Sequence, residues 1–389
     1  MRCASAFSTV ESSETAVREV VARLSETFDD GANQADLVVA FASSHHAEAL
    51  GMLGTILHES GLTRHSLGCT GETIVGDGRE VEDGPALSVW AIKLPEARFR
   101  AIRIDNRVDG DGIEGLKENR RDEETILLLG DPFTFDPGPW LKKLDREVPG
   151  LRVLGGMASA SQVPRGNRLL LDGRVWKDGA VGLVLGGMVA LHPLVSQGCR
   201  PIGRAMIVTK AEQNVIRELG RRPALEVLRE VFETLSGDDQ RRVQAGLHLG
   251  RVINEYQDTF ERGDFLVSNV MGADDSGGIA ITDLVRVGQT VQFHVRDAET
   301  ADEDLRTLIE NERLDRPRAR ISGALLFSCN GRGTRLFSSP DHDVSAIHDH
   351  YGAIPIAGFF AMGELGPVGG QNFVHGYTAS IVLFESTDE

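Results

Sequence analysis

Cys329, Asn330, Arg332 and Glu364 are the residues of this sequence best suited to binding or transforming a small molecule. The first three occur together in the segment CNGRG, and Glu364 follows in AMGELGPVGG. Arginine offers a planar fork of donors and an asparagine amide both donates and accepts, so Arg332 and Asn330 suit a ligand carboxylate. Glu364 suits an ammonium group. The four residues therefore predict a site for a molecule that carries both charges, such as an amino acid.

Cys329 adds the chemistry of a nucleophile, because a thiol beside glycine amides can be activated by a nearby base. His375 and His342 are the candidate bases. The competing interpretation is a buried cysteine that packs as a small hydrophobic residue, which is the commoner role of a free cysteine. Arg332 could likewise brace a domain interface, and Glu364 could serve a turn or a helix cap. Binding is therefore favoured over catalysis, and no residue is assigned a catalytic role.

Three short apolar segments surround these residues and predict buried strands. Each is bounded by glycine or proline, and they cover Ala324–Ser328, Ile354–Gly358 and Thr378–Phe384. The polar residues follow the first two segments. Loops from neighbouring strands converge at this edge of a sheet when helices connect the strands. The sequence therefore predicts a ligand site beyond the carboxyl ends of the strands.

The same order of strand, helix, strand and strand occurs twice more, earlier in the chain. Each predicted copy has four elements. The first strands cover 37–41, 125–130 and 324–328, and helices follow at 47–59, 139–147 and 343–351. The second strands cover 65–69, 152–155 and 354–358, and the last strands cover 86–93, 180–185 and 378–384. Strands at 99–105 and 291–296, each followed by an acidic helix, are predicted to precede the second and third copies. The expected fold class is α/β (α+β), with mixed β-sheets flanked by helices and built from repeated β-α-β-β units.

The first copy offers another carboxylate at the equivalent strand end, since Glu72 follows Cys69 in GCTGE. The middle copy has Ser159 or Ser161 there instead. The CNGRG residues have no counterparts in the other copies. They are therefore better candidates for a specific function than the glycines and apolar runs that all three copies share.

A domain boundary is predicted between Arg217 and Pro223, where a strand-rich segment gives way to a strong helix that starts at Pro223. This boundary divides the chain into domains of residues 1–220 and 221–389. No long low-complexity segment separates the two halves, so we expect them to pack tightly together.

Several motifs together resemble the FIST domain family. The sequence is similar to the C-terminal half of that family at 328–333 (SCNGRG), 358–360, 363–369 and 375–380, and to the N-terminal half at 68–72 (GCTGE) and 198–203 (GCRPIG). The resemblance extends from about residue 20 to about residue 385, and the motifs are more specific jointly than singly. It implies a FIST N-terminal domain, a FIST C-terminal domain and a bacterial sensory or signal-transduction module that binds a small ligand. The residues within or beside these motifs that become candidates for ligand binding are Cys69, Glu72, Cys329, Asn330, Arg332, Glu364 and His375.

The charge of the chain argues against several classes of partner. The 389 residues include 41 basic and 58 acidic ones, a net charge of −17. Nucleic acids and acidic membranes would be repelled at long range, so neither is expected as a partner.

The longest apolar stretch, Ala180–Leu191, is shorter than the roughly 20 residues of a spanning helix. The first residues lack the layout of a signal peptide, which predicts a cytoplasmic protein.

Known catalytic and metal-binding patterns are missing from the sequence. The four cysteines are scattered and form no CxxC pair, which indicates reduced thiols rather than disulfides or a zinc site. GxSxG and P-loop motifs do not occur, which lowers the expectation of the enzymes that use them. No metal and no cofactor are expected.

The leading hypothesis is a cytoplasmic sensory module that holds an amino acid or a related zwitterion at the strand-end turns. One alternative is an enzyme that uses Cys329 as its nucleophile. The other is an adaptor that binds a protein partner, because a eukaryotic relative pairs a FIST domain with an F-box.

Overall fold

The computed structural model describes residues 1–105, 112–121, 124–257, 259–260 and 262–386. The chain folds into two compact units. The first consists of Met1–Val195, Arg306–Val374 and Thr378–Glu389, and the second of Ser196–Leu305 and His375–Tyr377. The second unit is therefore an insertion in the sequence of the first. The division at residue 220 expected from the sequence concerns sequence domains and stays a prediction.

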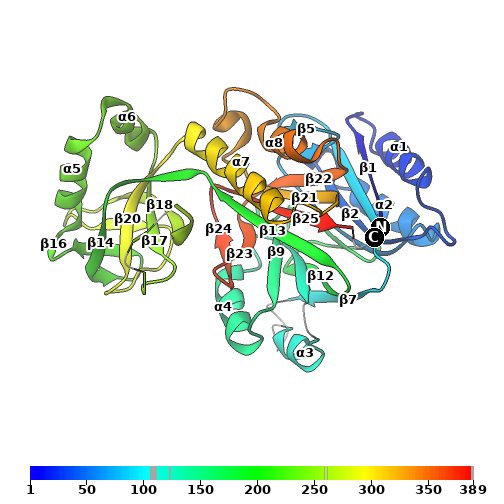
Figure 1. Ribbon diagram of the computed structural model, residues 1–389, viewed down its shortest axis with the longest axis horizontal. Helices are drawn as coiled ribbons and strands as arrows, with labels where there is room; N and C mark the ends of the chain where they lie inside the picture. The colour runs from blue at the N-terminus through cyan, green and yellow to red at the C-terminus, as the bar shows by residue number, and fades with distance from the viewer. Residues whose placement is uncertain (106–111, 122–123, 258, 261, 387–389) are drawn as a thin grey trace. The chain divides into compact units, whose positions relative to one another are not determined.

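Three six-stranded sheets form the first unit, and each is built around one of the predicted repeats (Figure 1). In every repeat the first two strands pair in parallel, and the last strand pairs antiparallel with the first. The predicted β-α-β-β order and its threefold repetition are confirmed. The mixed sheets with helices on their faces also confirm the predicted fold class.

The repeats have equivalent elements in the same order. The first repeat comprises β1 (Arg2–Ser8), α1 (Ser13–Ser25), β2 (Ala35–Ala42), α2 (Ala49–Glu59), β3 (Thr63–Thr70), β4 (Ile74–Gly76), β5 (Arg79–Val81) and β6 (Leu87–Lys93). The second comprises β7 (Ala97–Ile104), α3 (Ile113–Glu118), β8 (Thr125–Gly130), α4 (Pro137–Glu147), β9 (Arg152–Met157), β10 (Leu169–Leu171), β11 (Arg174–Trp176) and β12 (Ala180–Gly187). The third comprises β13 (Ala190–Gln197), α7 (Ala298–Asp315), β21 (Ile321–Cys329), α8 (His342–Tyr351), β22 (Ile356–Ala361), β23 (Glu364–Val368), β24 (Gln371–His375) and β25 (Thr378–Glu385).

Each repeat donates a two-stranded hairpin to the sheet of another repeat. Hairpin β4–β5 extends the third sheet beside β22, hairpin β10–β11 extends the first sheet beside β3, and hairpin β23–β24 extends the second sheet beside β9. The exchange is cyclic, so every sheet is completed by a different repeat. It also draws the carboxyl ends of β3, β9 and β22 toward one another.

One glycine in the second strand of each repeat makes the parallel pairing possible. These glycines are Gly68, Gly155 and Gly358. A Cβ atom built on them would lie 2.3, 2.0 and 2.1 Å, respectively, from a carbonyl oxygen of the neighbouring strand. Contacts that short are sterically forbidden, so any side chain would push the two strands apart.

The inner faces of the three sheets meet in one apolar core. Phe41, Phe327 and Phe359 contact one another there, with ring centroids 5.0, 5.9 and 6.1 Å apart. The outer faces are covered by helices, α1 and α2 on the first sheet and α3 and α4 on the second. Buried strands with apolar residues on both faces explain why the sequence shows continuous apolar runs rather than alternation.

The second unit is a seven-stranded antiparallel sheet with two helices. Its strand order is β14-β20-β17-β18-β19-β15-β16, and an additional pairing of β14 with β15 joins the sheet back on itself. Its elements are β14 (Cys199–Glu212), β15 (Val215–Leu219), β16 (Arg222–Pro223), α5 (Ala224–Thr234), α6 (Gly237–Ala245), β17 (Leu247–Val252), β18 (Phe265–Ala273), β19 (Ile279–Ile281) and β20 (Thr290–Arg296). Short 3-10 helices cover Ser44–His46, Arg262–Asp264 and Gly333–Arg335.

One predicted equivalence is wrong. The strand expected at 291–296 is β20, but it pairs with β14 and β17 in the second unit and is not the strand that precedes the third repeat. That place belongs to β13, which pairs with β25 as β7 pairs with β12. The insertion separates β13 from the rest of its repeat, so order along the chain pointed to the nearer strand.

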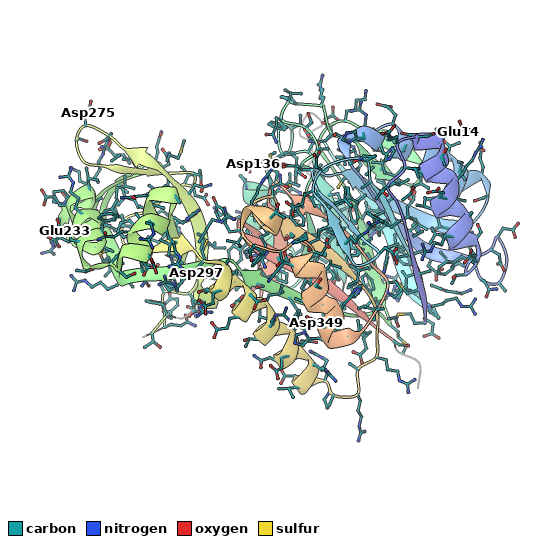
Figure 2. All side chains as sticks on the ribbon, turned by 90° about the horizontal axis from the view of Figure 1, so that it is seen from above. Glu14, Asp136, Glu233, Asp275, Asp297 and Asp349 are labelled. Atoms are coloured by element: carbon teal, nitrogen blue, oxygen red, sulfur yellow. The ribbon has the colours of Figure 1, made fainter. Side chains whose placement is uncertain are left out.

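Acidic side chains lie on the surfaces of both units. Figure 2 labels Glu14 on α1, Asp349 on α8 and Glu233 on α5, and all three are exposed. Among the described residues, no helix is long and apolar enough to cross a membrane. No group of three or more His, Cys, Asp or Glu side chains in the described part of the chain is arranged to hold a metal ion.

Candidate functional site

The three repeats meet at the carboxyl ends of their second strands, and Ser159 lies at the junction. Its hydroxyl accepts a hydrogen bond from the Glu72 amide at 2.9 Å and donates one to the Phe360 carbonyl. Its own amide donates to the Thr70 carbonyl at 3.1 Å. Ser159 is 1% exposed and touches all three repeats. The strand-end segments that contain Thr70, Ser159 and Phe360 therefore meet in the fold.

Arg332 lies in the turn after β21 and forms a buried ion pair with Asp343 in the first turn of α8. Its Nε and Nη2 atoms each donate to one carboxylate oxygen at 2.7 Å, and neither side chain is exposed. Burial opposes ionisation of Asp343, but the charge of Arg332 and hydrogen bonds from His342, Arg332 and Ser328 hold its pKa below the usual range. The donor fork that suits a ligand carboxylate is thus occupied by Asp343. Among the described residues, Nη1 of Arg332 finds no hydrogen-bond partner.

His342 contacts the same ion pair. Its Nδ1 lies 2.9 Å from a carboxylate oxygen of Asp343. Its ring stacks on Phe337 with centroids 3.4 Å apart, and the guanidinium of Arg332 lies 5.1 Å from that same phenyl ring. These contacts fix the imidazole against the ion pair.

Glu364 begins β23 and is fully buried. Its Oε2 accepts hydrogen bonds from the Thr378 amide at 3.2 Å and the Thr378 hydroxyl at 2.8 Å. Its Oε1 has no hydrogen-bond partner in the described part of the chain. Burial raises the pKa of Glu364 to about 8, although Thr378, the charge of Arg332 and the Cys329 thiol each oppose the rise. The carboxyl group is therefore largely protonated at neutral pH and lies within the influence of both Arg332 and Cys329.

Glu80 is a further buried acid close to the Arg332–Asp343 ion pair. It was not predicted from the sequence. It comes from hairpin β4–β5 of the first repeat, and its Oε1 accepts the Val344 amide at 2.9 Å. Its own amide donates to Asp341 at 2.6 Å, while Oε2 is buried without a partner among the described residues. Burial, followed by the negative charge of Asp343, raises the pKa of Glu80 to about 8. A lone glutamate in a short hairpin gives no sequence signal, because its burial depends on the exchange of hairpins.

Asp343 was also missed as a site residue, but it did carry a signal. It lies four residues before Ile347, which is buried, so both lie on the same stripe of α8. An acid on the apolar stripe of a helix predicts a buried partner of opposite charge.

Asn330 and Glu72 are connected through Arg335. The Arg335 side chain donates a hydrogen bond to the main-chain carbonyl of Asn330 at 2.9 Å and forms an ion pair with Glu72. The Oδ1 atom of Asn330 is buried and has no hydrogen-bond partner within the described ranges. Asn330, like Arg332 and Glu364, therefore keeps one unused polar atom.

The remaining predicted residues have different surroundings. Cys69 is fully buried in the core between the sheets, and burial raises the pKa of its thiol well above the usual value. Cys329 is only partly buried, and its sulfur accepts a hydrogen bond from the Gly331 amide at 3.4 Å. His375 is buried and belongs to the second compact unit, whereas the cluster around Arg332 belongs to the first.

A separate pocket of about 430 Å³ opens near the start of β8. It is lined by Arg98, Phe99, Arg100, Glu118, Asn119, Arg120, Arg121, Glu124 and Val184. None of these residues belongs to the predicted site. The pocket therefore lies apart from the convergent strand ends.

The chain matches two family models in succession. Residues 36–222 match the FIST N domain, and residues 224–367 match the FIST C domain. The Mycobacterium tuberculosis protein named Uncharacterized protein Rv0628c is 40% identical over 385 residues, which cover 99% of this chain and 100% of the relative. Uncharacterized protein MT0897 of M. tuberculosis and Uncharacterized protein Mb0898c of Mycobacterium bovis are each 44% identical over 319 residues, 82% of both chains. The chain belongs to the FIST family, whose domains are generally regarded as sensory and signal-transduction domains.

Proposed function

We propose that this FIST protein senses a small zwitterion, such as an amino acid, at the cluster of Arg332, Asn330 and Glu364. The observation that carries the proposal is that three residues of the CNGRG and GELGPVGG turns each have a buried polar atom without a partner in the described part of the chain. Glu364 Oε1, Arg332 Nη1 and Asn330 Oδ1 have no hydrogen-bond partner among the described residues. Buried polar atoms without partners cost about 1–3 kcal/mol each, and a ligand that satisfies them recovers this energy.

The charges favour recognition of an amino group. Among these cluster residues, Arg332 supplies the single buried guanidinium. It faces three acidic side chains, those of Glu80, Asp343 and Glu364. The pKa of Glu364 near 8 indicates that its carboxylate is poorly stabilised in the free protein. An ammonium group beside Oε1 would supply a stabilising cation and lower the pKa of Glu364.

The carboxylate of the ligand has a smaller set of donors than the sequence suggested. Asp343 occupies the fork of Arg332, which leaves Nη1 for the ligand. Arg335 adds a second positive charge at the same turn, and its side chain is 56% exposed. The proposed ligand therefore places its ammonium group inward at Glu364 and its carboxylate toward Arg332 Nη1 and Arg335.

A thermal-shift screen of amino acids and small carboxylates tests this function. A ligand at about 100 times its dissociation constant should stabilise the folded protein by roughly 2.7 kcal/mol. Glu364→Gln should abolish the shift because the amide cannot balance an ammonium charge. Glu14→Gln, on the exposed face of α1, is the matched control and should keep it. No stabilising compound, or one whose shift survives Glu364→Gln, would contradict the proposed site.

Signalling further requires that the bound state be read by another molecule. We propose a cytoplasmic protein partner for this role. Affinity purification in the presence and absence of a stabilising compound, followed by mass spectrometry, tests it. A partner retained in only one of the two conditions supports a sensory module, and a partner set that is identical in both contradicts it.

A further inference from the structure

Cys329 differs from the other cysteines of the chain in its surroundings. The side chains of Cys69 and Cys199 are 0% and 1% exposed. Burial raises the pKa of the Cys3 and Cys69 thiols well above the usual value. Cys3 and Cys329 are both partly exposed, and the sulfur of Cys329 accepts a hydrogen bond from the Gly331 amide. An amide N–H directed at sulfur favours the thiolate form, which is the reactive one.

Charged side chains complete the surroundings of this thiol. Arg332 and Arg335 both interact electrostatically with Cys329, and both cations favour the thiolate. Glu364 interacts with it from a fully buried position, yet Oε1 of that carboxyl group has no well-aligned hydrogen bond from the described residues. Arg332 Nη1, which is also buried, is likewise unpaired within the described part of the chain. The thiol thus lies beside a buried donor that is unpaired among the described residues, Arg332 Nη1, and within hydrogen-bonding reach of the buried Glu364 carboxyl group.

We propose that Cys329 is a peroxide-reactive thiol in a site formed by the Gly331 amide, the Arg332 guanidinium and the Glu364 carboxyl group. The sulfur attacks one oxygen of hydrogen peroxide, the O–O bond breaks, and a sulfenic acid forms at Cys329. The protonated carboxyl group of Glu364 donates its proton to the departing hydroxide, which leaves as water, and the proton that the thiol released to solvent restores the carboxyl group. Sulfur is oxidised and the departing oxygen is reduced, so the step needs no other reactant. Arg332 Nη1 stabilises the negative charge that develops on the peroxide oxygen.

Burial explains why the proposed oxidant is small. Arg332 is 1% exposed and Glu364 is fully buried, and hydrogen peroxide is small enough to reach both beside the sulfur. The reaction concerns the same turn as amino-acid binding but does not depend on it. A protein that binds no amino acid would still be oxidised at Cys329 if the proposal is correct.

Labelling of sulfenic acid tests the proposal directly in the full-length protein. The protein is treated with hydrogen peroxide and then with dimedone, and the modified peptides are identified by mass spectrometry. We expect the dimedone adduct on Cys329, with Cys3, Cys69 and Cys199 unmodified as internal controls. Oxidation of folded Cys329 should be at least about tenfold faster than oxidation of the same cysteine in urea-unfolded protein at equal pH.

Two variants separate the effect of the surrounding groups on the oxidation rate of Cys329 from the effect of its solvent exposure. Cys329→Ser should remove the adduct, and Glu364→Gln should slow adduct formation while Cys329 is still alkylated by iodoacetamide. Oxidation no faster in the folded than in the unfolded protein would overturn the proposal. So would an adduct spread over all four cysteines. Both of these readouts come from the wild-type chain, so the test does not depend on the folding of a variant.

Discussion

Arg332 and Asp343 form a bidentate ion pair in which both hydrogen bonds measure 2.7 Å and neither side chain is exposed to solvent. The pair joins the CNGRG turn to the first turn of α8. Beside it lie Cys329, which is partly exposed, and Glu364, which is buried and largely protonated. The ion pair holds the turn in place, so the neighbouring unused atoms are the ones that can meet a ligand.

Breaking the ion pair from one side should strongly destabilise the first unit. Asp343→Asn or Arg332→Gln leaves an uncompensated buried charge or donor, and the free energy of unfolding should fall by about 3–5 kcal/mol. Urea denaturation measures this change. Arg306→Gln, which breaks the exposed pair with Asp349, is the control and should cost less than about 1 kcal/mol. If Asp343→Asn lowers the free energy of unfolding no more than Arg306→Gln does, the buried pair does not stabilise the fold.

The stability of the protein should fall as the pH rises from about 5 to about 8. The pKa of Glu364 is raised in the folded state from 4.5 to about 8, so the folded state keeps a proton that the unfolded state loses in this range. The group alone contributes a slope of up to about 1.4 kcal/mol per pH unit. Glu364→Gln should remove that part of the slope in pH-dependent urea denaturation. Glu14→Gln should leave the slope unchanged, and an identical slope in both variants would contradict the assignment.

A side chain at the repeated glycine should separate the two parallel strands. Gly358→Ala places a Cβ 2.1 Å from the Leu326 carbonyl oxygen, and the expected cost is about 1–3 kcal/mol or more. Thermal unfolding measures it. A Cβ atom added at Gly115 in α3 would meet none of the described atoms within 4 Å, so Gly115→Ala should be neutral or slightly stabilising. Equal melting temperatures for both variants would refute the role of the glycine.

Removal of one hydroxyl should loosen the junction of the three repeats. Ser159→Ala deletes the acceptor of the Glu72 amide and the donor to the Phe360 carbonyl, which should cost about 1–3 kcal/mol. Hydrogen exchange at the Glu72 amide should rise more than exchange within β2. Ser161→Ala, at a partly exposed neighbouring position, is the matched control. Unchanged protection of Glu72 would show that Ser159 does not hold the junction.

The fold was predictable where local pattern determines structure. Apolar runs and glycines marked the strands of all three repeats, and the helices at 49–59, 137–147 and 342–351 followed from their apolar spacing. The exchange of hairpins was not predictable, because short segments such as 74–76 and 79–81 carry no signal for the sheet they join. The place of β13 was missed for the same reason, since its partner β25 is distant in the sequence.

The candidate site was predictable in composition but not in detail. Cys329, Arg332 and Glu364 lie in one cluster, as the strand-end rule suggested. The sequence could not reveal that Asp343 occupies the fork of Arg332, because two interpretations of a turn arginine fit equally well. Cys69 lies in the core, which follows the commoner role of a free cysteine.

A crystal structure of the protein with a stabilising amino acid tests the central claim most directly. We predict density for the ligand beside the CNGRG turn, with its ammonium nitrogen within hydrogen-bonding distance of Glu364 Oε1 and its carboxylate near Arg332 Nη1 and Arg335. Ligand density in the pocket lined by Arg98 and Arg121, with the cluster at Glu364 unchanged, would contradict the account.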